Sequence, residues 1–562
     1  MLIKVLTSWT LSQRLKDILK PERSFYLTSI VYSIGVSLLS LAIPISVQSL
    51  VNTVTFGVLT QPLIVLSFVL LGLLLLSGTL KALRVYILEL FQREFYARTT
   101  SDIALRILNS DHLSLKEHNG EELTNRYFDV MTVQKKATVL LTDGLAFFLQ
   151  TLVGLILLGF YHPYFLAFDL ILILLIYFVI ILFGKRAIDT AIYESKSKYE
   201  VADWLYEMAR YDLYFKSKKR KSWAIQFSDR LINKYLDKRE IHFKELFTQT
   251  IILLVIYALM SALILGLGGY LVIDGQLTLG QLVAAELVVT VILTSFAKMG
   301  KYLESFYDLC AAVEKISKFY ELKLEKNDLA ENKLFHSGEI HFNNIQHKDY
   351  GRTCLLDYKF DAEKIYFLST ILNSNKVIFL NLISAIIKPQ KGEIFIDGLS
   401  LQEINPNEIR DYIYIVSKPN LYRASLESNI HSINCSIKNS QLDDVLDIVG
   451  LGDLREHFIE GLEQVILSSG HPLWTSQLLK LEVAKALLSE SKLIILTENF
   501  DMIEKQTRDN ILEYAKYLKK TVIVFSNKST YNFEFDEYLS LEDSGIKKYE
   551  SPLQVFKARH DE

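Results

Sequence analysis

Long apolar stretches dominate the first half of the chain. Residues 24–80 contain no Asp, Glu, Lys or Arg, which is enough for two membrane-spanning helices because one span needs about 20 apolar residues. A turn near Pro62 is expected to separate them. Two further pairs of apolar stretches follow, one interrupted at 161–164 (YHPY) and the other at 274–278 (DGQLT). The pattern therefore predicts six spanning helices within residues 25–305.

Basic residues are distributed unevenly around these stretches. The short turns inside the three pairs contain no Lys or Arg, whereas the N-terminal segment (1–24) and the two long connections (93–136 and 186–245) are rich in both. Because basic loops stay on the cytoplasmic side, we expect the N-terminus, both connections and the C-terminal half to be cytoplasmic. The connections are predicted to be helical throughout and to reach beyond the bilayer.

Two acidic residues fall inside predicted spans, Asp169 in the fourth and Glu286 in the sixth. An intramembrane acid is a functional candidate by default. The alternative, which we favour, is that both lie within two turns of the outer boundary and reach headgroups or water.

The hydrophobic pattern changes near residue 334. Short β-rich runs separated by helical stretches follow, namely GEIHFNNI, KIYFLST, YIYIVS, KLIILT and TVIVFS. Such alternation predicts an α/β domain. We place it at 335–562 and interpret residues 306–334 as a charged helical linker. The predicted fold class is multi-domain, with an all-α six-helix transmembrane domain followed by an α/β, P-loop-like domain.

Composition agrees with a membrane part joined to a soluble part. The 562 residues are 50% hydrophobic and 22% charged, with a mean hydropathy of +0.22. The net charge of −3 gives no global basic field, so no nucleic-acid partner is expected. Cys310, Cys354 and Cys435 are scattered and odd in number, and predict neither a disulfide framework nor a metal site. We expect no removable signal peptide.

The order of these elements resembles an exporter-type ABC transporter half over nearly the whole chain. The segment PISVQSLVNTVTFG is similar to the equivalent part of type I secretion exporters. The resemblance implies an integral protein of a bacterial inner or plasma membrane. Its expected partners are the lipid membrane, a second ABC half (the same chain or a different, active subunit) and a secretion adaptor protein. No N-terminal peptidase-like domain is expected, so leader-peptide cleavage is not predicted.

The resemblance lets each nucleotide-site position be checked, beginning with the phosphate loop, which the family writes GxxxxGK[ST]. Lys376 holds the lysine position in TILNSNKVI. The glycines whose backbone N–H groups would face phosphate are replaced by Thr370, Asn373 and Asn375. Asn tolerates a left-handed backbone better than most residues, but Thr does not. Lys376 with Asn373, Ser374 and Asn375 remain the candidates for loose phosphate binding.

Both expected magnesium ligands are replaced. Val377 and Ile378 hold the hydroxyl positions after the lysine, and an aliphatic carbon cannot ligate Mg²⁺. In KLIILTENF, Thr497 holds the position of the metal-binding Asp, while Glu498 keeps the position of the catalytic Glu. A general base without metal or stabilised phosphate has little to act upon, so Glu498 is a vestigial candidate and no metal site is expected.

Three further positions also depart from the family pattern. The distal histidine is replaced by Asn527. The glutamine expected after YIYIV is Ser417 or Lys418, depending on a one-residue gap. The aromatic residue that would stack on adenine falls at Asp349, or at Tyr350 with a shift.

The signature loop, written LSGGQ in the family, matches only at its ends. Leu473 and Gln477 agree, but Trp474, Thr475 and Ser476 do not. This loop presents a helix N-terminus and closely approaching backbone to the γ-phosphate bound by the facing subunit. Side chains at the glycine positions block that approach.

These departures together predict a catalytically impaired pseudo-ATPase half that takes part in export or secretion as a dimer or with an active ABC partner. ATPase activity is expected to be absent or very weak, with no cofactor. One alternative is a non-transporting membrane scaffold or sensor; the other is an active exporter ATPase with divergent motifs, which would use ATP and Mg²⁺.

Residues 115–129 and 200–216 lie at the positions where the family's coupling helices dock onto the ATPase domains. The alternative is that they are plain solvated helices.

Overall fold

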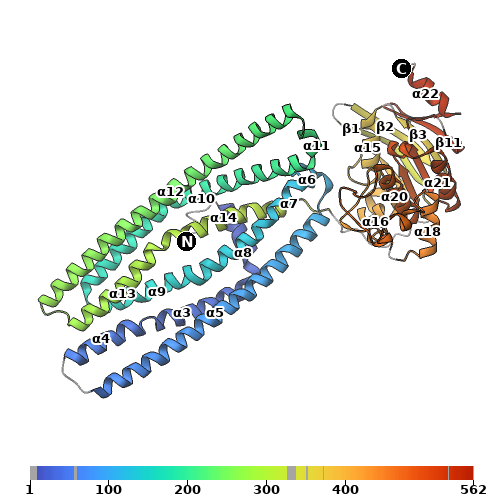
Figure 1. Cartoon of the computed structure of the whole chain (residues 1–562). Helices are drawn as coiled ribbons and strands as arrows, with labels where there is room; N and C mark the ends of the chain where they lie inside the picture. Colours follow the sequence, from blue (N-terminus) through green and yellow to red (C-terminus); the bar gives the residue numbers. More distant parts are fainter. Residues whose placement is uncertain are drawn as a thin grey trace. The chain divides into compact units, whose positions relative to one another are not determined.

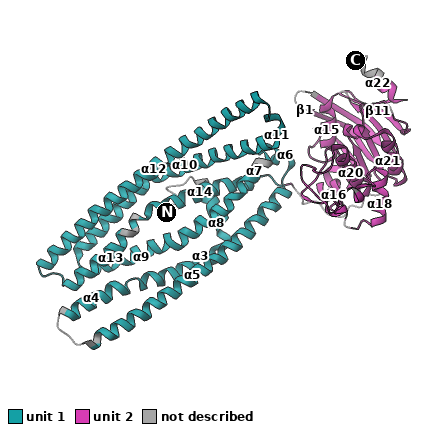
Figure 2. Cartoon of the chain, viewed as in Figure 1, with its two compact units in different colours: residues 1–324 teal, residues 325–562 magenta. Residues whose placement is uncertain are grey.

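The chain divides into two compact units, residues 1–324 and 325–562 (Figure 2). The computed structural model describes residues 9–55, 60–325, 337–349, 352–370, 372–434, 436–529 and 531–560. The boundary between the units falls inside the segment predicted as a linker. Gly57 in the first predicted turn, Tyr350 and Cys435 lie outside the described residues.

Unit 1 is built from helices that pack side by side (Figure 1). The longer ones are α2 (Trp9–Leu19), α3 (Arg23–Leu39), α4 (Ala42–Thr55), α5 (Thr60–Leu108), α8 (Asp129–Val139), α9 (Leu145–Tyr161), α10 (Pro163–Arg210), α12 (Lys218–Ile273), α13 (Leu279–Ala297) and α14 (Met299–Glu321). Short helices join them: η1 (Lys20–Glu22), α6 (His112–Glu117), α7 (Gly120–Asn125), η2 (Arg126–Phe128), η3 (Leu140–Gly144) and α11 (Asp212–Phe215).

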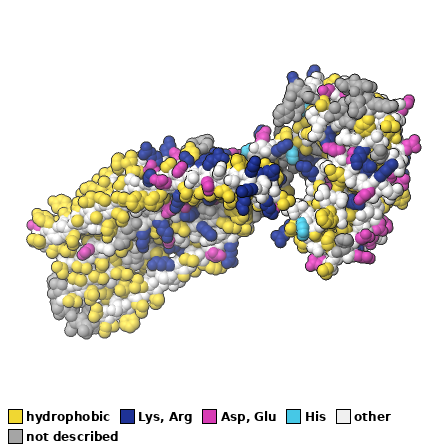
Figure 3. Space-filling model, turned by 45° about the horizontal axis from the view of Figure 1, so that its top comes forward, with side chains coloured by type: hydrophobic (Ala, Val, Ile, Leu, Met, Phe, Trp, Pro, Cys, Tyr) yellow, Lys and Arg dark blue, Asp and Glu magenta, His cyan; other side chains and the backbone are white. Residues whose placement is uncertain are grey.

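Five helical stretches of the described residues are long and apolar enough to cross a membrane: Leu11–Val54, Leu63–Leu108, Leu123–Tyr161, Pro163–Arg210 and Lys218–Ile273. A sixth apolar stretch, Leu279–Leu293, is shorter. Apolar side chains cover one end of unit 1 and Lys and Arg gather toward the other (Figure 3). Unit 1 is thus a helical membrane domain, and the count of six spans stays a prediction.

The spanning helices continue without a break into the long connections. The 56 residues of α12 are about 84 Å long at about 1.5 Å per residue, whereas a bilayer core is about 30 Å thick. The α10–α12 hairpin closes through α11, and the α5–α8 hairpin closes through α6 and α7. Both hairpins therefore extend well beyond one bilayer thickness.

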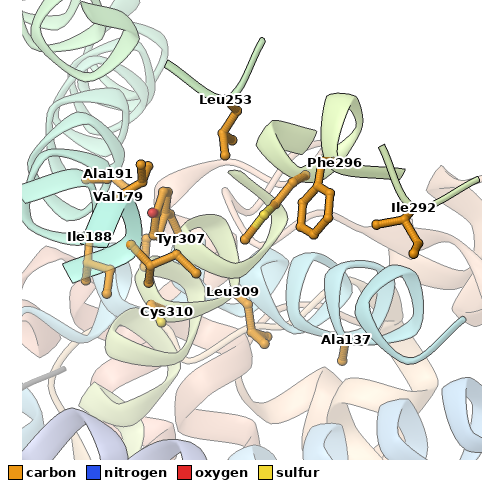
Figure 4. Close-up of a cluster of buried hydrophobic side chains, with 14 of the residues drawn as sticks. Ala137, Val179, Ile188, Ala191, Leu253, Ile292, Phe296, Tyr307, Leu309 and Cys310 are labelled. Carbon is orange, nitrogen blue, oxygen red and sulfur yellow. The ribbon is translucent and has the colours of Figure 1, made fainter. Parts of the chain in front are cut away.

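Helix α14 forms part of the unit 1 core although its sequence is rich in charge. Tyr307, Cys310 and Phe319 are fully buried, and Figure 4 shows Tyr307 and Cys310 among apolar side chains from neighbouring helices. Several charged side chains of α14 form ion pairs, as in the Lys136–Asp308 bridge at 2.6 Å. Most of the segment predicted as a linker is thus packed inside unit 1.

The two intramembrane acids differ in environment. Glu286 on α13 is exposed. Asp169 on α10 is only 6% exposed, so the prediction that it reaches headgroups or water is wrong. Phe165 and Leu172, which share its side of the helix, are buried as well, and this side of α10 faces the helix bundle.

Unit 2 is an α/β domain with three sheets. A six-stranded sheet has the order β12-β11-β3-β10-β9-β6, with every neighbouring pair parallel except β11–β12. An antiparallel sheet has the order β2-β1-β4-β5, and β7 pairs with β8. The strands are β1 (Ile340–Asp349), β2 (Arg352–Phe360), β3 (Ile365–Thr370), β4 (Lys391–Ile396), β5 (Leu399–Ser400), β6 (Ile413–Val416), β7 (Ala424–Ser425), β8 (Val465–Ile466), β9 (Leu493–Leu496), β10 (Thr521–Phe525), β11 (Glu537–Glu542) and β12 (Gly545–Tyr549).

The helices of unit 2 cover the six-stranded sheet. They are α15 (Asn373–Ile383), α16 (Pro406–Tyr412), α17 (Leu426–His431), α18 (Asn439–Ile448), α19 (Leu454–His457), α20 (Thr475–Leu488), α21 (Lys505–Tyr517) and α22 (Pro552–His560), with short turns η4 (Leu401–Glu403), η5 (Gly461–Glu463) and η6 (Glu498–Met502). Two buried apolar clusters lie on the sheet, one including α15 and the other including α20 and α21. Each of the five β-rich runs of the sequence forms a strand.

Gly392, near the start of strand β4, is required by the packing of β4 against β1. It has a φ of +81°, a conformation that favours glycine. A Cβ atom there would lie 2.3 Å from the carbonyl oxygen of Asn344 on β1. The β1–β4 sheet therefore requires glycine at this position.

Candidate functional site

The predicted site residues meet at the carboxyl ends of the central parallel strands, where open α/β sheets bind ligands. A cavity of about 190 Å³ lies there. Among the residues that line it are Thr370, Asn373, Lys376, Glu498 and Asn527. Ligand pockets are usually about 300–1,000 Å³, so the cavity is small for a nucleotide. The fold thus brings together five of the residues that the sequence singled out.

Lys376 and Glu498 are bound to each other inside this cavity. The Nζ atom of Lys376 on α15 donates a hydrogen bond to Oε1 of Glu498 in η6. Partial burial raises the pKa of the Glu498 carboxyl, but the bond from Lys376 and a backbone N–H outweigh this effect, so the pKa lies below its ordinary value. The Glu498 carboxyl is therefore ionised at neutral pH.

The stretch before Lys376 does not form a phosphate cradle. Helix α15 begins at Asn373, three residues before the lysine. None of the described residues between Thr370 and Ile378 has a positive φ, although anion-binding nests use left-handed residues to point successive N–H groups inward. Asn375 is buried, and its Nδ2 donates to Oδ1 of Asp543 at 2.9 Å. The residues from Asn373 to Lys376 thus form the first turn of a helix.

The two residues after Lys376 have different environments, and neither offers a ligand. Ile378 is buried in the apolar cluster beside α15. Val377 is 44% exposed, so an aliphatic side chain stands where the family has a hydroxyl group directed at the metal.

Thr497 uses its hydroxyl for the sheet. Its Oγ1 donates to the carbonyl oxygen of Val416 at 2.9 Å, and its backbone N–H donates to the same oxygen at 3.0 Å. The side chain is buried at the end of β9 and does not line the cavity. The position of the second metal ligand therefore serves β6–β9 packing.

Asp501 binds two residues that line the cavity, Ser526 and Asn527, and was not singled out from the sequence. It accepts hydrogen bonds from Ser526 Oγ (2.8 Å), Asn527 N (3.0 Å), Tyr531 Oη (2.6 Å) and Arg508 Nη1 (3.2 Å). Four donors satisfy a buried carboxylate, whose burial would otherwise be costly. The residue that replaces the distal histidine, Asn527, is thereby held through its backbone.

The signature-like stretch starts helix α20. Leu473 is buried, while Trp474, just before the first residue Thr475, is 76% exposed. Gln477 accepts a hydrogen bond at Oε1 from the Trp474 backbone N–H, at 2.9 Å. Gln477 therefore caps its own helix, and an indole stands beside the helix N-terminus where the family has small residues.

Comparison with known proteins agrees with this architecture. Residues 26–209 match the family model described as ABC transporter transmembrane region. The solved structure entitled "Structure of a bacterial Atm1-family ABC exporter with ATP bound" aligns with a TM-score of 0.82 over 96% of each chain, at 14% identity.

The chain carries the ABC transporter transmembrane region and has the fold of an ABC exporter, with the membrane domain fused to an ABC domain.

The curated relatives of this chain are distant. It is 24% identical over 326 residues to the "Transport/processing ATP-binding protein ComA" of Streptococcus pneumoniae, covering 56% of this chain and 45% of that protein. It is 23% identical over 271 residues to the "Leukotoxin export ATP-binding protein LtxB" of Aggregatibacter actinomycetemcomitans, covering 47% and 38%. A "Putative export ATP-binding/permease protein" of Rickettsia felis is 23% identical over 411 residues, 69% of each. The chain spans less than half the length of the first two relatives.

The ABC domain's glutamine position does not contribute to the cavity. Lys418 is exposed, and the carbonyl oxygen of Ser417 accepts a hydrogen bond from Asn499 Nδ2. Neither residue is among those lining the cavity. At the adenine-stacking position, only the backbone of Asp349, at the end of β1, is described.

A buried charged group next to this segment was also missed in the sequence. Glu482 on α20 accepts hydrogen bonds from Tyr414 Oη (2.9 Å), Asn420 Nδ2 (3.1 Å) and Lys485 Nζ (3.0 Å). Two charges three residues apart in the apolar stretch LLKLEVAKALL were the available signal. The network fastens the segment after β6 to the helix that carries the signature-like stretch.

The residues present do not fit Mg²⁺ and ATP. Val377 and Thr497 supply no metal ligand, and Lys376 is already paired. Among the described residues, no group of three or more His, Cys, Asp or Glu side chains is placed to hold a metal ion. The chain therefore has the ABC exporter fold, but Lys376, Glu498 and Thr497 at this site are bonded to other residues of unit 2.

Proposed function

We propose that this chain is a half of an ABC-type exporter whose own nucleotide site does not hydrolyse ATP. The observation that carries the proposal is the Lys376–Glu498 ion pair. In the family, the lysine must meet phosphate and the glutamate must activate water, so two residues bound to each other perform neither task. The lost ligands at Val377 and Thr497 support the same conclusion.

In the family, the signature loop of each ABC domain completes the ATP site of the facing subunit. The residues of this chain that would make that contribution are altered as well. Trp474 projects at the start of α20 beside the side chains of Thr475 and Ser476. A partner's γ-phosphate needs the close backbone approach that only glycine allows. A homodimer would therefore contain no complete site, and we propose an active ABC partner as the source of ATP hydrolysis, with a secretion adaptor as a further partner.

The retained helical hairpins support a role in transport. Residues 115–129 form α6, α7 and η2, and residues 200–216 form the end of α10 with α11. The second tip has five cations within residues 216–221. Unit 1 has 34 Lys and Arg against 28 Asp and Glu (net +6), whereas unit 2 has 27 against 36 (net −9). Opposite charge favours docking of such a tip on the ABC domain of a facing half.

A scaffold or sensor in the membrane is the second candidate function, and exposed Trp474 favours it. A large apolar side chain at a helix start is suited to protein contact. An active ATPase is favoured only by the presence of Lys376 and Glu498 in one cavity. In all three cases we place the chain in a bacterial inner or plasma membrane, with the N-terminus and unit 2 in the cytoplasm.

Deletion and rescue in the native cell test the proposal. We expect secreted protein to fall when the gene is deleted, and to recover equally with the wild-type chain and with Lys376→Ala. We also expect an intact ABC half to copurify with the chain. Normal export after deletion contradicts the transport role, and failed rescue by Lys376→Ala contradicts the loss of nucleotide chemistry, provided that both proteins reach the same level in the membrane.

A further inference from the structure

The N-terminal helix α2 is fixed to unit 1 along one side. Arg14 donates from Nη1 to Oε2 of Glu314 on α14 at 2.7 Å. Arg98 on α5 donates from Nη2 to the carbonyl oxygen of Ile18 at 2.9 Å, and from Nε to Oε1 of Glu22 at 2.5 Å. These contacts pair Glu314 and Glu22 and hold the helix at the start of the first apolar stretch.

The opposite side of α2 lines a groove of about 380 Å³ together with η1 and the start of α3. Leu15, Leu19 and Tyr26 form apolar walls, and Lys16, Lys20 and Arg23 supply three cations. All three cations are exposed. No ion pair involves them within the described part of the chain. The groove thus combines apolar walls with three cations that form no ion pair among the described residues.

An exposed apolar stripe on α3 begins one turn after Arg23. Leu27, Val31, Ile34 and Leu38 follow it at helical spacing and are 43% to 64% exposed. From Leu27 to Leu38 the stripe is about 16 Å long at about 1.5 Å per residue. Half of a bilayer core is about 15 Å, so the stripe matches the depth of one leaflet below the cations.

We propose that this groove binds the headgroup of an anionic phospholipid from the cytoplasmic leaflet, with an acyl chain lying along the α3 stripe. Basic clusters just cytoplasmic of a spanning helix attract anionic lipids. Free phosphate would make no use of the apolar walls and stripe. A second copy would bring the same three cations against themselves. The proposal does not depend on the nucleotide chemistry of unit 2.

Lipid titration of the full chain in a mild, uncharged detergent tests the proposal. Phosphatidylglycerol, phosphatidylcholine and inorganic phosphate are added separately, and binding is followed by native mass spectrometry and by melting temperature. We expect phosphatidylglycerol to bind and raise the melting temperature, and the other two to have little effect. An equal effect of phosphatidylcholine, or a full effect of phosphate alone, overturns the proposal.

Charge removal identifies the site. The triple variant Lys16→Gln, Lys20→Gln, Arg23→Gln is expected to bind phosphatidylglycerol at least tenfold more weakly. Lys218→Gln, Lys219→Gln, Lys221→Gln removes the same charge from the α12 start and is expected to bind like the wild type. Equal binding by the first variant, or equal loss in both, overturns the proposal.

A second pair of variants leaves every charge in place, which guards against misfolding of the triple variant. Ser12 lines the groove and its neighbour Gln13 is exposed. Ser12→Trp fills the groove and is expected to weaken phosphatidylglycerol binding severalfold, while Gln13→Trp is expected to have no effect. If Ser12→Trp binds lipid as the wild type does, or if this variant instead changes the oligomeric state, the groove does not hold lipid.

Discussion

Lys376 and Glu498 lie 122 residues apart in the sequence and are joined as an ion pair in one cavity. One comes from the helix after β3 and the other from the turn after β9. The pair satisfies the only two charged groups among the described residues that line this cavity. The two charged side chains of this cavity are thus mutual partners, and this relationship can be tested by removing one of them.

Glu498→Gln should release Lys376 for phosphate. The neutral amide no longer balances the ammonium charge, so we expect weak ATP binding that does not require Mg²⁺. At an ATP concentration ten times Kd, binding contributes about 1.4 kcal/mol, or about 2–4 °C in melting temperature. Thermal unfolding with ATP and EDTA measures it.

Glu504→Gln is the matched control for that experiment. Glu504 also pairs with a lysine, Lys480, at 2.8 Å, and it does not line the cavity. An ATP shift equal in both variants, or absent from Glu498→Gln, would show that the ion pair is not what keeps phosphate out.

Thr497→Asp should destabilise the protein rather than restore a metal site. The carboxylate cannot donate to the Val416 carbonyl and would be buried without a partner, which costs about 2–4 kcal/mol. Thr497→Val, the control, loses one hydrogen bond and should cost about 1 kcal/mol. Melting temperatures with and without Mg²⁺ test this. Mg²⁺-dependent stabilisation of Thr497→Asp would contradict the geometry.

Glu482→Ala should be among the most damaging single changes in unit 2. It leaves the buried Lys485 without its carboxylate, and breaking a buried ion pair costs about 3–5 kcal/mol. Glu482→Gln keeps the acceptor and should cost less, and exposed Glu513→Ala should cost little. Unfolding midpoints of the three variants give the order, and equal values would refute the role of this network.

Lys520 should make stability depend on pH. Its Nζ donates to the carbonyl oxygens of Ala486 (3.3 Å) and Ser489 (2.7 Å) at the end of α20, and burial lowers its pKa to about 8. The unfolded pKa is about 10.4. Between these values the unfolded state binds more protons, so stability rises with pH.

The measurement compares the wild type with Lys520→Met at pH 7.5 and pH 9.5. The wild type should gain about 2 kcal/mol more than the variant, from about 1.36 kcal/mol per pKa unit. Lys505→Met, an exposed control, should keep the wild-type gain. A parallel pH response of wild type and Lys520→Met would contradict the assigned pKa.

The sequence predicted that Lys376 follows one strand and that Thr497 stands at the end of another, and β3 and β9 are found there, because hydrophobic runs of this length form buried strands. It could not show that Lys376 binds Glu498, since that contact depends on how two distant loops close over the sheet. Asp169 was misplaced for a related reason. Hydropathy gives the depth of a residue in a span, but the side of the helix that is buried depends on which helices pack against it.

Helix α14 shows the same limit in unit 1. Its charges favoured a solvated linker, but Glu314 and Asp308 are paired with Arg14 and Lys136 from other elements. Those partners are far away in the sequence. The charged residues of α14 therefore indicated which side of the helix carries ion pairs. That the side with Tyr307 is buried became evident only from the fold.

Titration of Mg·ATP into the purified full-length chain by calorimetry, with phosphate release followed in the same preparation, tests the loss of nucleotide chemistry most directly. We predict no Mg²⁺-dependent binding at millimolar ATP and no phosphate release above that of Lys376→Ala. Saturable Mg²⁺-dependent binding, with turnover that disappears in Lys376→Ala, would contradict the account.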